Sequence, residues 1–235
     1  MPLLLNTMSF KRKSHAQHAG ELELQRLRAP NQHAWLQQHL QGSHVIPAQH
    51  SLFFSQLPYL GLGSLDATGR PWATLLVTRR VTSSAEDTLE VSGVFAAGDP
   101  FALAMATLST PRLFAGVGVD FSNRRRNKLS GYVVAAAVSH EARSIELTLV
   151  TTENLGNCPK YITVRPLRPS AREPAPPVPL GGALSDGAMA VLGRCSTAFI
   201  ATVHPDPDDD ADSDMCVFTP RKGAAGSCCR FEHST

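Results

Sequence analysis

Apolar and polar residues alternate along much of the middle of the chain, which is the pattern of half-buried β-strands. Between Ala142 and Thr152, for example, Ile145 and Leu147 are separated by the polar Glu146. Five preceding segments are also predicted to be strands: Tyr59 to Leu65, Pro71 to Thr78, Thr88 to Phe95, Arg112 to Phe121, which is rich in small residues, and Arg125 to Val138. Six short strands in succession predict a mainly β protein, built as a small closed antiparallel barrel rather than a parallel sheet.

Segments rich in helix-forming residues flank the predicted strands. The predicted helices are Ala16 to Arg28, Asn31 to Gln41, Ser51 to Gln56, Pro100 to about Leu108 and Leu184 to Arg194. Asp99 is placed to cap the free amides of the fourth helix, and Ser185 or Asp186 those of the fifth. A further strand is predicted from Thr197 to His204, before a tail without clear periodicity.

A proline-rich stretch divides the chain. Six prolines lie between residues 166 and 179 and predict a semi-rigid extended linker. We therefore expect a helical leader over residues 1–45, a barrel over 46–165, the linker over 166–183 and a second unit over 184–235. The second unit starts like the first, because a predicted helix is followed by Phe199-Ile200-Ala201-Thr202 as another precedes Tyr59-Leu60-Gly61-Leu62. This echo predicts a partial second barrel.

Composition narrows the class of protein. The chain has 235 residues, 43% of them hydrophobic, and a formal charge of +2, which suits a packed domain and not a dedicated nucleic-acid binder. No apolar run approaches the roughly 20 residues that cross a bilayer, and the first apolar patch precedes its basic residues, the reverse of a signal peptide. We therefore expect a cytoplasmic protein that contacts neither nucleic acid nor membrane.

The cysteines and acidic runs do not predict a metal centre. Five cysteines without regular spacing give no disulfide framework. Cys228-Cys229 with His233 lacks a partner pair for zinc, and Asp208-Asp209-Asp210 lacks the spacing and glycine of a calcium loop.

The first candidate site is Gly69-Arg70-Pro71-Trp72-Ala73-Thr74-Leu75-Leu76. A tight turn after Asp66 delivers an arginine and then an extended strand, which can offer main-chain groups to the edge of a planar heterocycle. A plain hairpin with a solvated Arg70 is the alternative.

The second candidate site is the basic run from Arg124 to Lys128. In a strand Arg124, Arg126 and Lys128 fall on one face, where three cations can hold a phosphate. The alternative is a charged strand edge that prevents aggregation.

The third candidate site is Gly156-Asn157-Cys158-Pro159-Lys160-Tyr161-Ile162. The Gly-Asn pair predicts a turn that places Asn157 and Lys160 at the rim of a ligand pocket. The alternative is a capped turn before a short helix, with Cys158 as a small buried residue. The sequence contains no Ser-His-Asp or Cys-His arrangement that makes Cys158 a nucleophile, so no catalytic residue is assigned.

Together these motifs resemble the pyridoxamine 5′-phosphate oxidase-like family of FMN-binding split barrels, in particular its flavin-nucleotide-binding branch. The matching motifs are His18-Ala19-Gly20-Glu21 with Gln25, Asp66 with Gly69-Arg70-Pro71-Trp72-Ala73, Asp99-Pro100-Phe101, Val119-Asp120-Phe121 with Arg124-Arg125-Arg126, and the third candidate site. The resemblance covers residues from about 15 to 205. It implies a six-stranded Greek-key split barrel with flanking helices and with FMN at an interface between two barrels.

The resemblance also implies the site. The strand Trp72 to Leu76 would line the flavin, and Arg126 and Lys128 would contact the phosphate. The predicted cofactor-binding residues are Arg70, Trp72, Ala73, Thr74, Leu75, Arg126, Lys128, Asn157 and Lys160. After Asp214 the family pattern calls for a basic, glycine-rich stretch and more strands, which this sequence lacks. We expect a truncated or misassembled C-terminus, testable by sequencing the transcript, and a homodimer as one source of the missing barrel.

These features predict a flavoprotein that binds FMN and acts as an oxidoreductase on a small molecule. The alternative is a non-catalytic split-barrel scaffold that lacks a complete flavin site. A third interpretation is a barrel that binds another cofactor, such as haem or a deazaflavin, although no histidine is placed to favour haem.

Overall fold

The computed structural model describes residues 23, 26–27, 43–109, 111–157, 162–168, 170, 182–195, 197–204 and 214–218. Residues 157, 204 and 214–218 are described by their backbone alone. Glu23, Arg26 and Leu27 are helical, as predicted. Residues 1–22, 24–25 and 28–42 of the leader, residues 171–181 of the predicted linker, Lys160 and the cysteines outside these ranges lie outside the described residues. The proposed domain boundaries stay a prediction.

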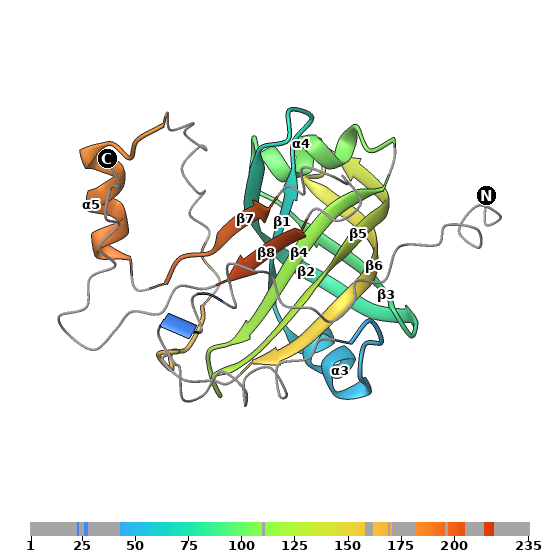
Figure 1. Ribbon diagram of the computed structural model, residues 1–235. Coiled ribbons are helices and arrows are strands. Elements are labelled where there is room, and N and C mark those ends of the chain that lie inside the picture. Colours follow the sequence, from blue (N-terminus) through green and yellow to red (C-terminus); the bar gives the residue numbers. More distant parts are fainter. Residues whose placement is uncertain are drawn as a thin grey trace.

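Six antiparallel strands close into a barrel in the order β1-β2-β3-β6-β5-β4, with β4 pairing back to β1 (Figure 1). Their bounds are β1 Tyr59–Leu65, β2 Pro71–Ala85, β3 Thr88–Val94, β4 Arg112–Asp120, β5 Arg125–Ser139 and β6 Ser144–Asn157. Each half of the barrel is a three-stranded meander, and the connection from β3 to β4 crosses between the halves. The predicted mainly β fold with a six-stranded antiparallel barrel is confirmed.

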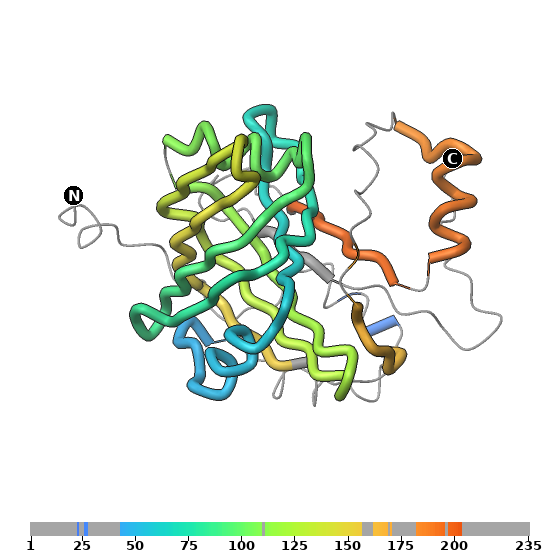
Figure 2. The backbone as a smooth tube through the Cα atoms, turned by 180° about the vertical axis from the view of Figure 1, so that it is seen from behind, coloured from blue at the N-terminus to red at the C-terminus, as the bar shows by residue number. Residues whose placement is uncertain are grey.

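Helices and one small sheet accompany the barrel in the described part of the chain. Helix α3 spans Ala48–Gln56 and helix α4 spans Pro100–Ala106, and the two lie at opposite ends of the barrel (Figure 1). Helix α5 spans Asp186–Arg194 and stands apart from the barrel. The second sheet pairs β7, Ile200–His204, with β8, Asp214–Phe218. Seen from behind, the strands of the barrel lie in front of β7, so β7 lies on one side of the barrel (Figure 2).

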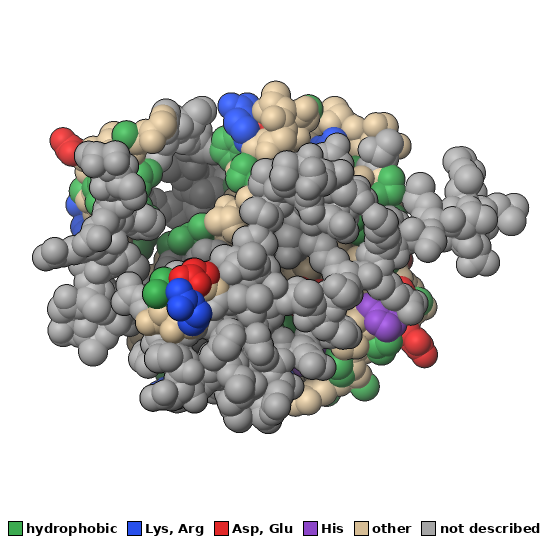
Figure 3. Space-filling view, viewed as in Figure 1, with side chains coloured by type: hydrophobic (Ala, Val, Ile, Leu, Met, Phe, Trp, Pro, Cys, Tyr) green, Lys and Arg blue, Asp and Glu red, His purple; other side chains and the backbone are tan. Residues whose placement is uncertain are grey.

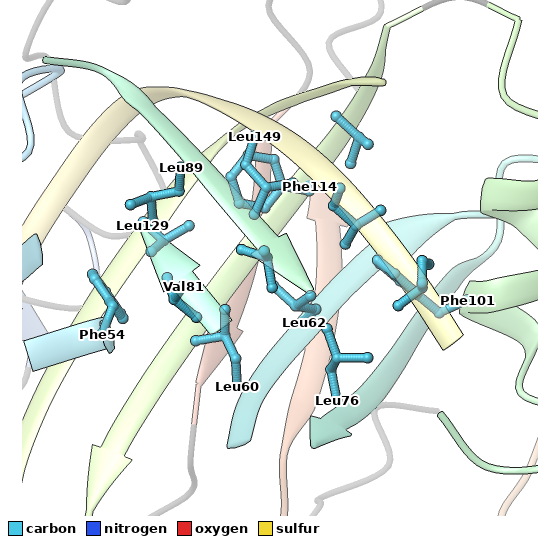
Figure 4. Close-up of a cluster of buried hydrophobic side chains, with 14 of the residues drawn as sticks. Phe54, Leu60, Leu62, Leu76, Val81, Leu89, Phe101, Phe114, Leu129 and Leu149 are labelled. Carbon is cyan, nitrogen blue, oxygen red and sulfur yellow. The ribbon is translucent and has the colours of Figure 1, made fainter. Parts of the chain in front are cut away.

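The barrel is filled by the apolar residues that the alternation places inward. Leu60 and Leu62 of β1 and Leu76 of β2 are among the fully buried side chains. Phe54 of α3 and Phe101 of α4 reach this core from its two ends (Figure 4). Because a closed barrel leaves no free sheet edge, every strand contributes alternate residues to one common interior.

Helix α4 is tied to the barrel through its cap. The Asp99 carboxylate accepts hydrogen bonds from the amides of Phe101 at 2.9 Å and Ala102 at 3.3 Å. Its other oxygen accepts a short hydrogen bond from the hydroxyl of Thr74, a residue of β2 that points into the barrel. Asp99 is 8% exposed, so these bonds lie in a nearly dry environment.

We expect Asp99→Ala to lower the free energy of unfolding by about 2 kcal/mol, because two helix amides lose their cap and the buried Thr74 hydroxyl loses its acceptor. Urea unfolding followed by circular dichroism measures the change. The control is Asp186→Ala, an exposed carboxylate in the first turn of α5, which we expect to change stability by less than about 0.5 kcal/mol. Equal effects for the two variants would contradict a structural role for Asp99.

The structure corrects three boundaries from the sequence. Strand β2 continues past the predicted end at Thr78 because Val81, 3% exposed, restores the inward apolar position beyond two arginines. Strand β6 continues past Thr152 to Asn157, where Asn127 and Arg126 of β5 pair with its last two residues. The predicted Gly156-Asn157 turn is therefore wrong, since both residues extend the sheet. Strand β8 occupies a tail in which the sequence shows no strand pattern.

Candidate ligand-binding face

The register of the barrel brings two of the candidate motifs to one outer face. Leu75 of β2 lies opposite Gly61 of β1, and Gly61 lies opposite Val117 of β4. Val117 in turn lies opposite Lys128 of β5. Directly opposite residues in an antiparallel pair point to the same side of the sheet. Leu75 and Lys128 therefore end one continuous row, about 14 Å long at three strand spacings.

A parallel row starts at Ala73 and passes through Gly63 and Ala115 to Ser130. Glycine, alanine and serine leave this part of the face flat. The side chains of Leu75 and Val77 are 49% and 53% exposed, so β2 presents an exposed apolar strip, defined as Ala73, Leu75 and Val77. A planar apolar ring can lie against such a strip.

The cationic end of the face lies on β5. Lys128 is half-buried, and Arg126 is only 4% exposed on the same outer side. Arg126 lies opposite Asn157, which extends this end of the face by one strand. The structure thus brings Ala73, Leu75, Arg126, Lys128 and the backbone of Asn157 to one face.

Three predicted site residues lie elsewhere. Thr74 points into the barrel, where it bonds to Asp99. The indole of Trp72 donates to the Asp66 carboxylate at 2.9 Å, and the guanidinium of the exposed Arg70 donates to the same oxygen at 3.0 Å. The period of two within the strand explains the split, because Ala73 and Leu75 necessarily face the side that Thr74 does not.

The turn between β1 and β2 is organised by Asp66. Its carboxylate accepts hydrogen bonds from the Thr68 hydroxyl at 2.7 Å and from the amides of Thr68 and Arg70. The hydrogen bonds from Thr68 and from the Trp72 indole hold the pKa of Asp66 well below its usual value. Asp66 therefore remains a carboxylate and fixes the hairpin that starts the exposed strip.

Only two cations of the basic run share the face. Arg124 has a φ of +67° and belongs to the turn before β5, so its predicted place beside Arg126 and Lys128 is wrong. The Arg125 guanidinium lies 5.1 Å from the centre of the Phe53 ring of α3. A left-handed residue breaks the strand alternation, which the sequence pattern alone does not reveal.

The middle of the face is covered by the second sheet. Strand β7 contacts β2 and β1, and β8 contacts β4, β1 and β5. Phe199, just before β7, lies directly over Gly61: a Cβ atom built on Gly61 would come within 2.8 Å of the Phe199 ring. Figure 1 shows β7 and β8 crossing in front of the barrel at this point.

An aromatic cluster anchors this cover. The ring of Tyr59 stands edge to face with Phe199, with ring centres 6.2 Å apart, and stacks on Phe121 at 6.4 Å. Its hydroxyl donates to the Val119 carbonyl at 2.7 Å, and burial, with Asp120 nearby, raises the pKa of Tyr59 so that it stays neutral. The sequence predicts a strand in this segment and a likeness of Phe199 to Tyr59, but neither signal predicts that the two rings meet.

Arg165 joins the cover from the end of the barrel. Its guanidinium lies 5.1 Å from the centre of the Phe121 ring and donates to the Thr197 hydroxyl at 3.2 Å. Its backbone amide also donates to the Phe121 carbonyl. The chain after β6 and the chain before β7 are thus held together on the outer face.

Helix α5 lies apart from this face (Figure 1). Its apolar side chains include Met189, Val191 and Leu192, which are 40–53% exposed. Figure 3 shows hydrophobic side chains at the left of the molecule, where α5 lies apart from the barrel.

Within the described ranges, no helix is long and apolar enough to cross a membrane. In the same part of the chain, no three His, Cys, Asp or Glu side chains gather as metal ligands would. Cys228, Cys229, His233 and the run from Asp208 to Asp210 lie outside it.

The fold defines the class of protein as a closed, six-stranded antiparallel β-barrel. No protein family and no curated protein matches the sequence. Among solved structures, the barrel is similar to an F420 reductase, with a TM-score of 0.32 and 9% sequence identity over 46% of this chain and 98% of that one. A match at this level carries no argument about activity.

Proposed function

We propose that the outer face of the barrel binds a flavin nucleotide, specifically FMN, and that the protein acts as an FMN-dependent oxidoreductase on a small molecule. One observation supports this most directly: the row from Leu75 to Lys128 joins an exposed apolar strip to a cationic end across small residues. A ligand with a flat ring at one end and a phosphate at the other matches that order of chemistry.

In this proposal each part of the face has one role. The apolar strip contacts the ring, and main-chain groups of β2 before Val77, where its pairing with β3 begins, orient the polar rim of the ring. The Arg126 guanidinium pairs with two phosphate oxygens, and the Lys128 ammonium adds a point charge. A bound flavin supplies the electron transfer itself, while the protein provides binding, orientation and electrostatics.

The cover formed by β7 and β8 belongs to the proposal. We propose that residues 184–235 start a second barrel and that β7 and β8 take the place of a partner barrel on this face. A second copy of the chain is the other source of such a partner. Asn157, the last residue of β6, and Lys160 remain proposed rim residues.

We expect Lys128→Gln to weaken FMN binding by about tenfold to a hundredfold, because a charge-assisted contact contributes roughly 1.5–3 kcal/mol. Riboflavin, which has the same ring and no phosphate, should lose almost nothing. Quenching of flavin fluorescence during titration of both ligands measures the two affinities.

The control is Arg80→Gln, which removes an exposed charge of β2 away from the row. It should leave both affinities unchanged at physiological salt, where exposed charges are screened. Equal losses for FMN and riboflavin in Lys128→Gln would refute the phosphate contact.

A non-catalytic scaffold is the second candidate function, and the position of Phe199 over Gly61 favours it, because that ring occupies the middle of the row. The absorbance spectrum of the purified protein separates the two. Flavin bands, or their appearance after adding FMN and removing the excess, support the flavoprotein. A colourless protein that takes up no FMN would leave the non-catalytic scaffold as the only candidate function.

A further inference from the structure

Two carboxamides lie inside the barrel at the end that α3 covers. Asn127 of β5 and Asn154 of β6 are 5% and 3% exposed. Asn127 lies opposite Gly156, and Asn154 lies opposite the inward Leu129, so the two amides are diagonal neighbours on the interior side. Side chains on such a diagonal are within reach of a single small bridging group.

The hydrogen bonds of these amides are incomplete. The Asn154 amide nitrogen donates to the carbonyls of Ser43 and His44, both at 3.1 Å, and to the Thr151 hydroxyl at 3.0 Å. Its buried oxygen Oδ1 has no partner in the structure as described, and the same holds for Asn127 Nδ2. Buried polar atoms of native proteins are normally bonded to protein or to ordered water.

A third polar atom belongs to the same mouth of the barrel. His50 Nδ1, on α3, is also buried without a partner in the described structure. A Cβ atom built on Gly156 would lie 3.3 Å from His50 Nε2 and 3.7 Å from Asn127 Oδ1, the second polar atoms of the same two groups, so the imidazole ring and the amide group lie close to one point. Gly156 is exposed and has no side chain of its own beside these two groups.

The protonation of His50 suits a neutral partner. Burial, and then the charge of Arg125, lower the pKa of His50 below its usual value. The imidazole is therefore neutral at pH 7, with one nitrogen that donates and one that accepts.

We propose that an ordered water molecule occupies this mouth and bridges the three atoms. The water accepts a hydrogen bond from Asn127 Nδ2, donates one to Asn154 Oδ1 and makes a third with His50 Nδ1. Three hydrogen bonds are typical of a buried water. The lone pairs of Asn154 Oδ1 would repel an anion, and the amide protons of Asn127 would repel a cation. A water molecule can donate to the first group and accept from the second.

This hydration site ties α3, β5 and β6 together at the start of β5. Asn127 sits between Arg126 and Lys128, which point to the opposite side of the sheet. The water therefore positions the strand that carries both outer cations, and it does so whether or not that face binds a flavin.

The test begins with the unmodified full-length chain in solution. A water–protein NMR experiment should show a long-lived cross-peak between water and the side-chain amide protons of Asn127, and His50→Leu should weaken it. Absence of that cross-peak in the wild type would overturn the proposal.

Unfolding measurements give an independent test. Asn127→Leu should lower the urea midpoint, because it removes a partner of a bound water, and adding His50→Leu should lower it little further, because both changes empty one site. The control pairs Asn127→Leu with Thr74→Val at the opposite end of the barrel, and these two losses should add. A raised urea midpoint for Asn127→Leu would show that no water is bound there, because replacing a buried amide that lacks hydrogen bonds with an apolar side chain stabilises the protein. That result, or additive losses for Asn127 and His50, would also overturn the proposal.

Discussion

Gly131→Ala is expected to lower the free energy of unfolding by about 3 kcal/mol, near the upper end of ordinary single substitutions. Gly131 has a φ of +156°, and a Cβ atom built on it would lie 2.0 Å from the Val150 carbonyl oxygen and 2.9 Å from the Thr151 Cα. These atoms belong to the backbone of the paired strand β6 and cannot swing aside. The methyl group must therefore part β5 from β6 where their register shifts. Urea unfolding measures the loss.

Gly182→Ala is the matched control, because no atom of the described residues lies within 4 Å of the position that its Cβ would take. We expect that variant to stay within about 0.5 kcal/mol of the wild type. If Gly131→Ala behaved the same way, the tight approach of β5 and β6 would be wrong.

The sequence predicted the barrel because its evidence is local. Alternation at Leu89 and Val91 marks β3, the spacing of Asp66 and Gly69 marks a turn, and Asp99 with Pro100 marks a helix start. Each of these signals depends on neighbouring residues, so no knowledge of strand pairing is required.

The candidate site was predicted less well because its arrangement depends on strands far apart in the chain. The period of two separates Ala73 from Thr74, but only the closed barrel determines which of them faces the core. Likewise Arg124 leaves the basic face because of its left-handed backbone, and Gly156 continues a strand because β5 is long enough to pair with it. The row from Leu75 to Lys128 crosses two intervening strands, a register that no local pattern encodes.

Gly61→Ala is expected to loosen the cover formed by β7 and β8. The new methyl group would lie 2.8 and 3.0 Å from atoms of the Phe199 ring and 3.2 Å from Val117, so the ring must leave the place it occupies over Gly61. Losing that contact should lower the free energy of opening of the cover by roughly 1.5–3 kcal/mol. Amide exchange in β7 should therefore speed up about tenfold to a hundredfold. Hydrogen–deuterium exchange of the β7 amides measures this directly.

The control for this variant is a second substitution that removes the Phe199 ring. In a Phe199→Ala background the added methyl group no longer meets the ring, and only its 3.2 Å contact with Val117 of the barrel remains, so Gly61→Ala should change β7 exchange little further. Equal increments in both backgrounds would show that Gly61 acts on the barrel rather than on its cover.

The same ring should also limit flavin binding, because Phe199 lies over the middle of the row whose ends are Leu75 and Lys128. A ligand that spans both ends has to displace the ring, so only the fraction of molecules with a displaced ring can bind it, and its apparent affinity falls by that fraction. Phe199→Ala removes this competition, and we expect FMN to bind about tenfold to a hundredfold more tightly, because docking of the ring contributes roughly 1.5–3 kcal/mol. Titration of flavin fluorescence, beside hydrogen exchange of β7 in the same variant, separates the outcomes. Faster exchange with weaker FMN binding would mean that Phe199 forms a wall of the pocket, which contradicts the competition and places the ring of the flavin beside β7 instead of beneath it.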